Sequence, residues 1–514
     1  MPKPCSELFG LDSVKTMEFV RMKSGLTGDH YRFQCVYKGF VVEGYEAMVH
    51  AKNGTATSVY FKIPRNLQLD INPALAVEDA ALNIPNFDSL VVEPSDGLAI
   101  INTAPNIYGG EDTHFVLTYK FKVNANFPDG KTFYVNAHTG VIERIIPLSL
   151  ECNTPVNAQT FYSGLRTIVV NDEGNQTLSL NDCTRGNIET LKFRYTGFSF
   201  FPEVLFMTYE LDPIPFNFNE VSYYNDAHWG AEMTYDYYSV FHNRNGIDDN
   251  NFRMRTVLDD ELWIFGTQLP WFDQVRWRNQ DSSVWISRSS PGIQPFTSLD
   301  VIGHEFTHGI TNFEADLIYQ GESGALNESF SDIFGTMIEF YGKDGNGNWL
   351  LGEEPLENFS SYFRSMSDPN AGETPDTYGG LYWFDTNSQT DNGGVHTNSG
   401  VQNHWFYLLS EGGSGESEYG IPYNVVAIGR NDAAKIAYCN LTERLVSSSN
   451  YVEAALQSLE CAIDLFGVCS PQVLAVKEAW KAVGINIGVS LPCGNETSFP
   501  DGVYTEEDGW VYVQ

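Results

Sequence analysis

The sequence contains no apolar run long enough for a membrane-spanning helix. Such a helix needs about 20 predominantly apolar residues, and every apolar stretch of this chain is shorter than about 18. Residues 1–20 also lack the basic segment and apolar core of a secretory signal peptide. We therefore expect no membrane span, and we expect that an export signal, if the protein is secreted, has been removed.

Basic residues are scarce. The chain has 30 Lys and Arg against 66 Asp and Glu, which gives a formal net charge of −36. A surface of this charge repels phosphate backbones, so we expect no direct binding of nucleic acid. The charge is typical of a soluble extracellular protein in which most carboxylates are solvated and some could bind calcium.

The eight cysteines include no C-x-x-C pair, which argues against a thiolate zinc site or a thioredoxin-like motif. Six of them follow residue 150 and could form three disulfides. Asn-x-Ser/Thr glycosylation motifs give weak further support for secretion. They begin at Asn53, Asn175, Asn327, Asn358, Asn440 and Asn495.

Two small parts are expected before residue 150. Residues 1–65 alternate apolar and polar side chains, with a hairpin turn at Asn53-Gly54, so they predict a small antiparallel sheet. In residues 66–150, Asn72-Pro73 opens a predicted helix over 74–82. Strands are expected to follow over 115–123 and 133–137.

The pattern changes after residue 150. Strand-like segments rich in Tyr and Phe extend to about residue 290, with one predicted helix over 226–238. After residue 298 the periodicity is mainly helical. We therefore predict an α+β fold with a β-rich lobe over 151–310 and a mainly helical lobe over 311–486. Residues 487–514, rich in Gly, Pro and acids, predict a tail on the surface.

The run Val301 to His308 carries the motif H-E-x-x-H. His304 and His308 are four residues apart, so on a helix both imidazoles lie on one face and can share a metal ion. Imidazole and carboxylate ligands suit zinc. Glu305 is not a ligand in this geometry, but it lies beside the metal, where it can accept a proton from water.

A third ligand is available 20 residues downstream of His308. Ser323 is expected to cap a helix with an apolar stripe, and Glu328 and Asp332 lie on its polar face. Glu328 can complete a site of three protein ligands and one open position. Asp332 can accept the second N–H of a ligand histidine.

Together with two further blocks, these residues resemble the thermolysin-like metallopeptidases, also called gluzincins. The further blocks are Arg364–Pro369 and Asp391–Gly400, and the resemblance covers about residues 151–486. It implies a zinc endopeptidase of two lobes, with the active-site helix near residues 298–313 between them and zinc in the cleft. Protein or peptide substrates would be hydrolysed there, and the family implies a hydrophobic primed-side preference.

The resemblance also assigns roles beyond the zinc ligands His304, His308 and Glu328 and the general base Glu305. Tyr319 and His396 would stabilise the oxyanion of the tetrahedral intermediate. Asp391 would orient His396, and Arg364 would contact the substrate backbone.

The family carries calcium as well. Four residues fall where its calcium ligands lie, and we expect one ion there. They are Asp300, Glu339, Asn348 and Glu353. The loop from Asp344 is not an EF-hand, because Trp349 and Pro355 replace the required Gly and Glu.

The strand along which substrate binds departs from the family pattern. Asn-Ala-x-Trp is usual there, and this chain has Gln274 and Val275 before Trp277. Phe363 stands where Leu is usual. Because these side chains are larger, we expect Gln274 and Val275 to bind substrate in a narrower primed-side pocket.

Residues 1–65 resemble the fungalysin/thermolysin propeptide domain, and residues 66–150 resemble a PepSY domain. This resemblance implies a zymogen whose pro-region acts as an intramolecular inhibitor, with cleavage near residues 145–160. Two other functions stay open. The chain could bind zinc without catalysis, or it could be an aminopeptidase of a related H-E-x-x-H group, although it has no G-x-M-E-N-type motif for a free amino terminus.

Overall fold

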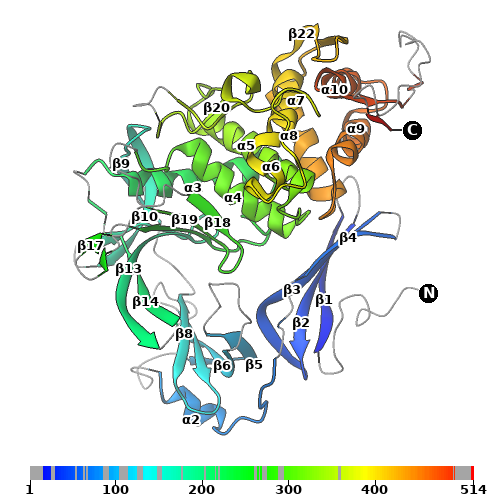
Figure 1. Cartoon of the computed structure of the whole chain (residues 1–514). Helices are drawn as coiled ribbons and strands as arrows, with labels where there is room; N and C mark the ends of the chain where they lie inside the picture. Colours follow the sequence, from blue (N-terminus) through cyan, green and yellow to red (C-terminus); the bar gives the residue numbers. More distant parts are fainter. Residues whose placement is uncertain are drawn as a thin grey trace. The chain divides into compact units, whose positions relative to one another are not determined.

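We describe the chain from a computed structural model (Figure 1). It describes residues 15–24, 29–52, 55–61, 64, 67–84, 92–103, 114–123, 131–147, 153–174, 177–201, 204–214, 216–217, 220–259, 263–264, 267–268, 275–287, 294–356, 361–489, 491–492 and 511–513. The chain divides into two compact units, Met1–Thr154 and Pro155–Gln514. The α+β class predicted from the sequence is confirmed, and the units divide close to residue 150.

The first unit contains one eight-stranded sheet. Its strands are β1 (Lys15–Ser24), β2 (Asp29–Tyr37), β3 (Phe40–Lys52), β4 (Thr55–Phe61), β5 (Val92–Asn102), β6 (Phe115–Val123), β7 (Lys131–Asn136) and β8 (Ile142–Pro147). They lie in the order β1-β2-β3-β5-β6-β7-β8, and β4 pairs with β3. The parallel β3–β5 pair joins strands from both parts expected before residue 150. The division at residue 65 therefore stays a prediction.

The predicted helix over 74–82 is shorter in the structure. Helix α2 spans Val77–Ala81, and its buried residues are Ala80 and Ala81. The backbone N–H groups of Ala74 and Leu75 both donate to the carbonyl of Ala137 instead. The prediction was wrong at this end because the contact to residue 137 holds the segment outside the helix.

The second unit begins with strands. A three-stranded sheet contains β9 (Thr154–Gln159), β10 (Leu165–Gly174) and β11 (Thr177–Ser179). A six-stranded sheet contains β12 (Asn181–Asp182), β13 (Ile188–Phe201), β14 (Val204–Pro213), β15 (Met254–Asp259), β18 (Val275–Arg278) and β19 (Ser283–Ile286). Helix α3 (Tyr223–His242) contacts β10, β13 and β15. Short pairs are β16 (Trp263–Ile264) with β17 (Thr267–Gln268), β20 (Leu350–Leu351) with β21 (Arg364–Ser365), and β22 (Gly413–Glu416) with β23 (Pro422–Val425).

Helices dominate the rest of this unit, as the periodicity predicted. They are α4 (Leu299–Phe313), α5 (Gly321–Gly342), the 3-10 helix η3 (Pro369–Gly372), α6 (Asp391–Asn398), α7 (Gly400–Glu411), α8 (Arg430–Cys439), the π-helix η4 (Asn440–Arg444), α9 (Tyr451–Phe466) and α10 (Pro471–Ala482). A disulfide between Cys439 and Cys461 links α8 to α9. Figure 1 shows α4 and α5 near the centre of the second unit.

Helix α5 is buried on all sides. The predicted apolar stripe is confirmed, but Glu328 and Asp332 are also 0% exposed, so the expected polar face does not face solvent. The helix begins at Gly321 after the N-cap Gln320. Ser323 is therefore not the cap, because its hydroxyl donates to the carbonyls of Ile318 and Gln320.

Glycines let α4 and α5 approach each other closely. A Cβ atom on Gly335 would lie 2.5 Å from the carbonyl oxygen of Asp300 and 3.1 Å from the backbone nitrogen of His304. A Cβ atom on Gly303 would lie 2.9 Å from Ile338. Real Cβ atoms do not approach backbone this closely, so the spacing of the two helices requires glycine at residue 335.

Two strands near the end of the chain pair within the second unit. Strand β25 (Val511–Val513) lies parallel to β24 (Ile485–Ile487). Among the described residues, no helix has both the length and the hydrophobicity that a membrane crossing requires.

His228 is a fully buried imidazole on α3. Its Nε2 lies 2.9 Å from the carbonyl oxygen of Val169, and its Nδ1 lies 2.9 Å from the hydroxyl of Thr190. A carbonyl can only accept, so Nε2 donates, and the Thr190 hydroxyl can donate to Nδ1, which is the pattern of a neutral ring. Burial, aided by the charge of Arg185, lowers the pKa of His228 to about 4.

We predict that His228 makes the fold sensitive to acid. An unfolded histidine has a pKa near ~6.5, so from about pH 6.5 to about pH 4 only the unfolded chain binds this proton. The free energy of unfolding then falls by about 1.4 kcal/mol for each unit of decreasing pH. Urea denaturation at several pH values should show a shallower dependence in His228→Gln. An identical slope in both proteins would contradict the prediction.

Candidate active site

Helix α4 brings the two histidines of H-E-x-x-H together. His304 and His308 lie one turn apart, and their Nε2 atoms are 3.0 Å from each other. Both side chains are about one-tenth exposed. Two imidazole nitrogens this close are well placed to share one cation.

Glu328 of α5 supplies the third donor. Its Oε2 lies 3.5 Å from His304 Nε2, and its Oε1 lies 3.3 Å from His308 Nε2. The three donor atoms all lie within 4.8 Å of one another. Within the described part of the chain, the buried Glu328 Oε2 has no hydrogen-bond partner. Two imidazoles and a carboxylate with an unsatisfied oxygen fit zinc.

The charges of this cluster are strongly coupled. Burial alone would raise the pKa of Glu328, but the imidazoles of His396, His308 and His304 outweigh it and hold that pKa well below its usual value. Burial lowers the pKa of His308, and Glu328 then raises it to about 9. The Glu328 carboxylate is therefore anionic, and a positive charge beside it is favourable.

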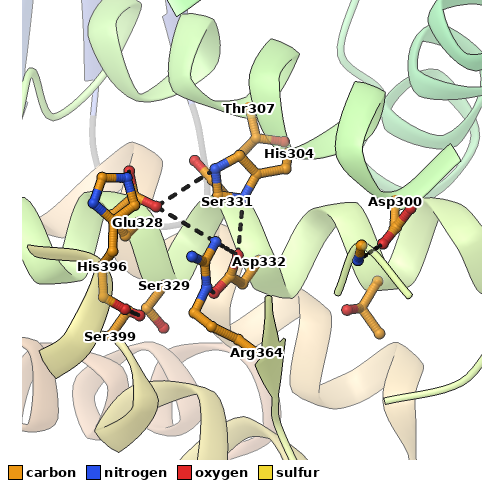
Figure 2. A network of polar contacts seen from close by, with 12 residues as sticks. Asp300, His304, Thr307, Glu328, Ser329, Ser331, Asp332, Arg364, His396 and Ser399 are labelled. Atoms are coloured by element: carbon orange, nitrogen blue, oxygen red, sulfur yellow. Dashed lines mark hydrogen bonds and ion pairs between the residues drawn. The ribbon is translucent and has the colours of Figure 1, made fainter. Parts of the chain in front are cut away.

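Asp332 lies below His304 in Figure 2, where a dashed line joins the two side chains. Its Oδ1 is 2.8 Å from His304 Nδ1, which fixes the ring so that Nε2 faces the cluster. The guanidinium of Arg364 donates to both Asp332 oxygens, over 2.6 and 2.7 Å. Burial raises the pKa of Asp332, but Arg364 and His304 outweigh it and lower that pKa to about 2.

His308 is held by residues that the sequence analysis missed. Its Nδ1 lies 2.8 Å from Asn327 Oδ1 and 3.1 Å from the hydroxyl of Ser331. Asn327 begins a predicted glycosylation motif, yet it is 8% exposed. Asn440 is fully buried as well and donates to Ala454. Both are therefore inaccessible to glycosylation in the folded protein, and only the position of Asn327 next to Glu328 hinted at its role.

Tyr319 and His396 extend the cluster on the side of Glu328. The Tyr319 hydroxyl donates to Glu328 Oε1 and lies 3.1 Å from His396 Nε2. Burial and the charge of Glu328 hold the pKa of Tyr319 well above its usual value, so its hydroxyl remains a donor. Burial lowers the pKa of His396, but Glu328 and Asp391 outweigh it and raise that pKa.

Asp391 holds His396 through a left-handed turn. Its Oδ1 lies 2.5 Å from His396 Nδ1, and its Oδ2 accepts from the backbone N–H of His396. Positive φ angles run from Asp391 to Gly394. A Cβ on Gly393 would lie 2.4 Å from the carbonyl of Thr386. The Asp-Asn-Gly-Gly sequence is thus what this backbone requires.

Glu305 is buried at 4% exposure, next to His304 on α4. Its Oε2 has no hydrogen-bond partner among the residues described. A buried carboxylate oxygen with no partner is costly unless a ligand or water uses it. This is the property expected of a proton acceptor beside a metal.

The four residues expected to bind calcium lie near one another, although among the described residues only the zinc cluster brings three donor atoms within 4.8 Å. Asp300 Oδ2 accepts from the backbone N–H of Gly352, Glu339 Oε2 accepts from that of Asn348, and Asn348 Nδ2 donates to Glu353 Oε1. Burial and the charge of Asp300 raise the pKa of Glu339 to about 7 and that of Glu353 to about 8. A bound cation would relieve this repulsion.

The expectations for the substrate strand have different outcomes. Gln274 lies outside the described residues. Val275 begins β18, where it is half-buried and pairs with Ile286. Their roles in substrate binding stay predictions, as does that of Arg364.

Known proteins match this chain over most of its length. The sequence model of the thermolysin metallopeptidase catalytic domain matches residues 156–312, and that of the thermolysin alpha-helical domain matches residues 315–485. A bacillolysin of Brevibacillus brevis is 34% identical over 468 residues, which cover 89% of this chain and 82% of that protein.

Two further relatives match smaller parts. A thermolysin of Alicyclobacillus acidocaldarius subsp. acidocaldarius is 40% identical over 263 residues, or 51% of this chain and 45% of that protein. The solved precursor of protealysin, a metalloproteinase from Serratia proteamaculans, aligns with 24% identity and a TM-score of 0.42, over 58% of this chain and 88% of that one.

We predict that Asn327→Ala weakens metal binding without unfolding the protein. The substitution removes the acceptor that orients His308, and loss of such a partner typically costs about 10–100-fold in metal affinity. Competition with a chromophoric chelator measures the change. Asn312→Ala is the control, because that half-buried side chain lies on α4 and donates to Asp316 instead. Equal zinc affinity in the two variants would refute the role of Asn327.

Proposed function

Since the chain belongs to the thermolysin family of metallopeptidases, we propose that His304, His308 and Glu328 bind zinc and that Glu305 is the general base. The enzyme is a zinc metalloendopeptidase made with a propeptide. The observation that carries the site assignment is the convergence of two Nε2 atoms and one carboxylate beside the unpartnered oxygen of Glu305.

The side chains around the metal site have separate roles in peptide hydrolysis. When bound, zinc supplies Lewis-acid chemistry, because it polarises a carbonyl and lowers the pKa of water. Glu305 accepts a proton from the attacking water at Oε2 and passes it to the leaving amine. The Tyr319 hydroxyl and His396 Nε2 donate to the oxyanion. Asp391 holds the Nδ1 side of His396, so that Nε2 points to the site.

Substrate contacts are proposed for three residues. Arg364 would contact the substrate backbone while its Nε and Nη2 remain on Asp332. Gln274 and Val275 would line a narrow, hydrophobic primed-side pocket, as their size relative to the family pattern suggests. The substrates are proteins.

We propose that the first unit inhibits the second until it is cleaved off. Two observations support this role. The alignment with bacillolysin spans 468 residues, far more than the matched catalytic region. The division between the units at Thr154 falls within the expected cleavage region of residues 145–160. We also propose that the enzyme is secreted, which its acidic surface and the Cys439–Cys461 disulfide support.

The calcium that is typical of the family is proposed to bind Asp300, Glu339, Asn348 and Glu353. The ion pairs of Lys343 favour one calcium ion here rather than two. Its Nζ lies 2.8 Å from Glu339 Oε1 and 2.7 Å from Glu354 Oε1, so an ammonium already neutralises one side of this acidic group. A divalent cation would balance the carboxylates that remain.

We predict that Glu305→Gln abolishes peptide hydrolysis and leaves zinc bound. Removal of a general base costs about 10²–10⁴-fold in rate, whereas the three metal donors are untouched. The assays are cleavage of a protein substrate by the mature enzyme, and the intact mass of the full chain with and without chelator. Glu411→Gln, at an exposed end of α7, is the control.

Three outcomes would contradict this function. Full activity of Glu305→Gln would refute the mechanism. A mature form that binds zinc and cleaves no protein would indicate a binding role. Trimming of N-terminal residues without internal cuts would indicate an aminopeptidase.

We predict that calcium raises the melting temperature and that a calcium chelator lowers it. A ligand at 100 times its Kd stabilises the fold by about 2.7 kcal/mol. Glu353→Gln removes one charge from the acidic group, so calcium should then raise the melting temperature less. Glu453→Gln, in the capping box of α9, is the control. A calcium effect of the same size in Glu353→Gln and wild type would show that the ion binds elsewhere.

A further inference from the structure

Polar side chains from three other elements contact the carboxylate of Asp332. Its Oδ1 lies 2.8 Å from His304 Nδ1 of α4, an ion-pair distance, and accepts from Arg364 Nη2 of β21 over 2.7 Å. Its Oδ2 receives Arg364 Nε at 2.6 Å and Asn403 Nδ2 of α7 at 2.7 Å. Of these groups, only Asn403 lies on α7, the helix that follows the turn holding His396.

A buried chain of hydrogen bonds fixes the amide of Asn403. Gln402 Nε2 donates to the hydroxyl of Ser329 over 3.2 Å, and that hydroxyl donates to Asn403 Oδ1 over 2.8 Å. Asn403, Ser329 and Gln402 are all 0% exposed. Because Oδ1 must accept from Ser329, the amide turns its N–H₂ toward Asp332. The chain of donors therefore runs in one direction and ends on that carboxylate.

Arg364 serves two groups in the proposed function. Its guanidinium keeps Nε and Nη2 on Asp332 and also contacts the substrate backbone. The amide of Asn403 is buried and takes no part in substrate contact. It can hold the carboxylate in place throughout the cycle, and with it the ring of His304.

We propose that Asn403 is a positioning residue of the zinc site: it holds Asp332 so that His304 keeps the orientation that zinc binding needs. The proposal rests on the proposed function. The same side chain ties α7 to α5, so it also fixes the helix beside His396 relative to Glu328. Neighbours of this kind in a ligand's hydrogen-bond network tune metal affinity and geometry.

The test uses Asn403→Asp, which keeps the shape of the side chain and replaces the donor with an acceptor facing Asp332. The full chain carries Glu305→Gln in every sample so that it does not cut itself. Zinc affinity is measured by chelator competition, and the visible spectrum is recorded with Co²⁺ in place of zinc. We expect zinc affinity to fall about 10–100-fold and the cobalt bands to shift.

Asn440→Asp is the matched control. Asn440 is equally buried, but it donates to the backbone carbonyl of Ala454 rather than to the metal site. It should lower stability and leave zinc affinity and the cobalt spectrum unchanged. If Asn403→Asp behaves like this control, Asn403 has only a structural role and the proposal is wrong.

Ser329→Ala covers the case in which Asn403→Asp does not fold. It removes the donor to Asn403 Oδ1 and the acceptor of Gln402 Nε2 but leaves Asn403 in place, so we expect the same spectral shift with smaller size. An unchanged spectrum would overturn the proposal. A parent chain that binds no zinc would refute the proposed function itself. A parent chain that binds zinc, with an Asn403 variant equal to it, would refute only the role of Asn403.

Discussion

The close approach of α4 and α5 is the constraint on which the site depends. The two histidines come from one helix and the carboxylate from the other, so the donors converge only if the helices nearly touch. Gly335 makes this possible, because any side chain there would meet the backbone of Asp300 and His304. The loss of helix propensity that glycine causes is offset by this packing.

The burial of negative charge is a second constraint on this acidic chain. Asp332 and Glu328 are fully buried, and each is matched by imidazole or guanidinium groups within 3.6 Å. Among the described residues, Lys343 is the only cationic side chain that forms an ion pair with Asp300, Glu339 or Glu353. The carboxylates of the first group are matched by these partners, and the second group retains an excess of negative charge.

Much of the metal site could be predicted because local spacing determines it. His304, Glu305 and His308 lie within two helical turns, and Glu328 and Asp332 are one turn apart, so periodicity alone places each set on one face. The structure brings all five into one cluster. The fold class and the extent of α4 were predictable for the same reason.

The misses share a physical cause, since they depend on contacts between distant segments. Helix α2 begins late because the backbone of residues 74 and 75 bonds to Ala137. Ser323 bonds to the turn before α5 instead of capping it. The roles of Asn327 and Asn403 appear only once α5 lies against α4 and α7. No local pattern distinguishes such an asparagine from a glycosylation site or a solvated one.

Gly335 contacts α4 between the acidic group and the zinc cluster. Asp300 and His304 are one turn apart on α4, and Glu339 and Asp332 are seven residues apart on α5. One pair of helices therefore carries residues of both the acidic group and the zinc cluster. A cation that drew Asp300 toward Glu339 would also shift His304 relative to Glu328, and each metal would then alter the affinity for the other by the same factor.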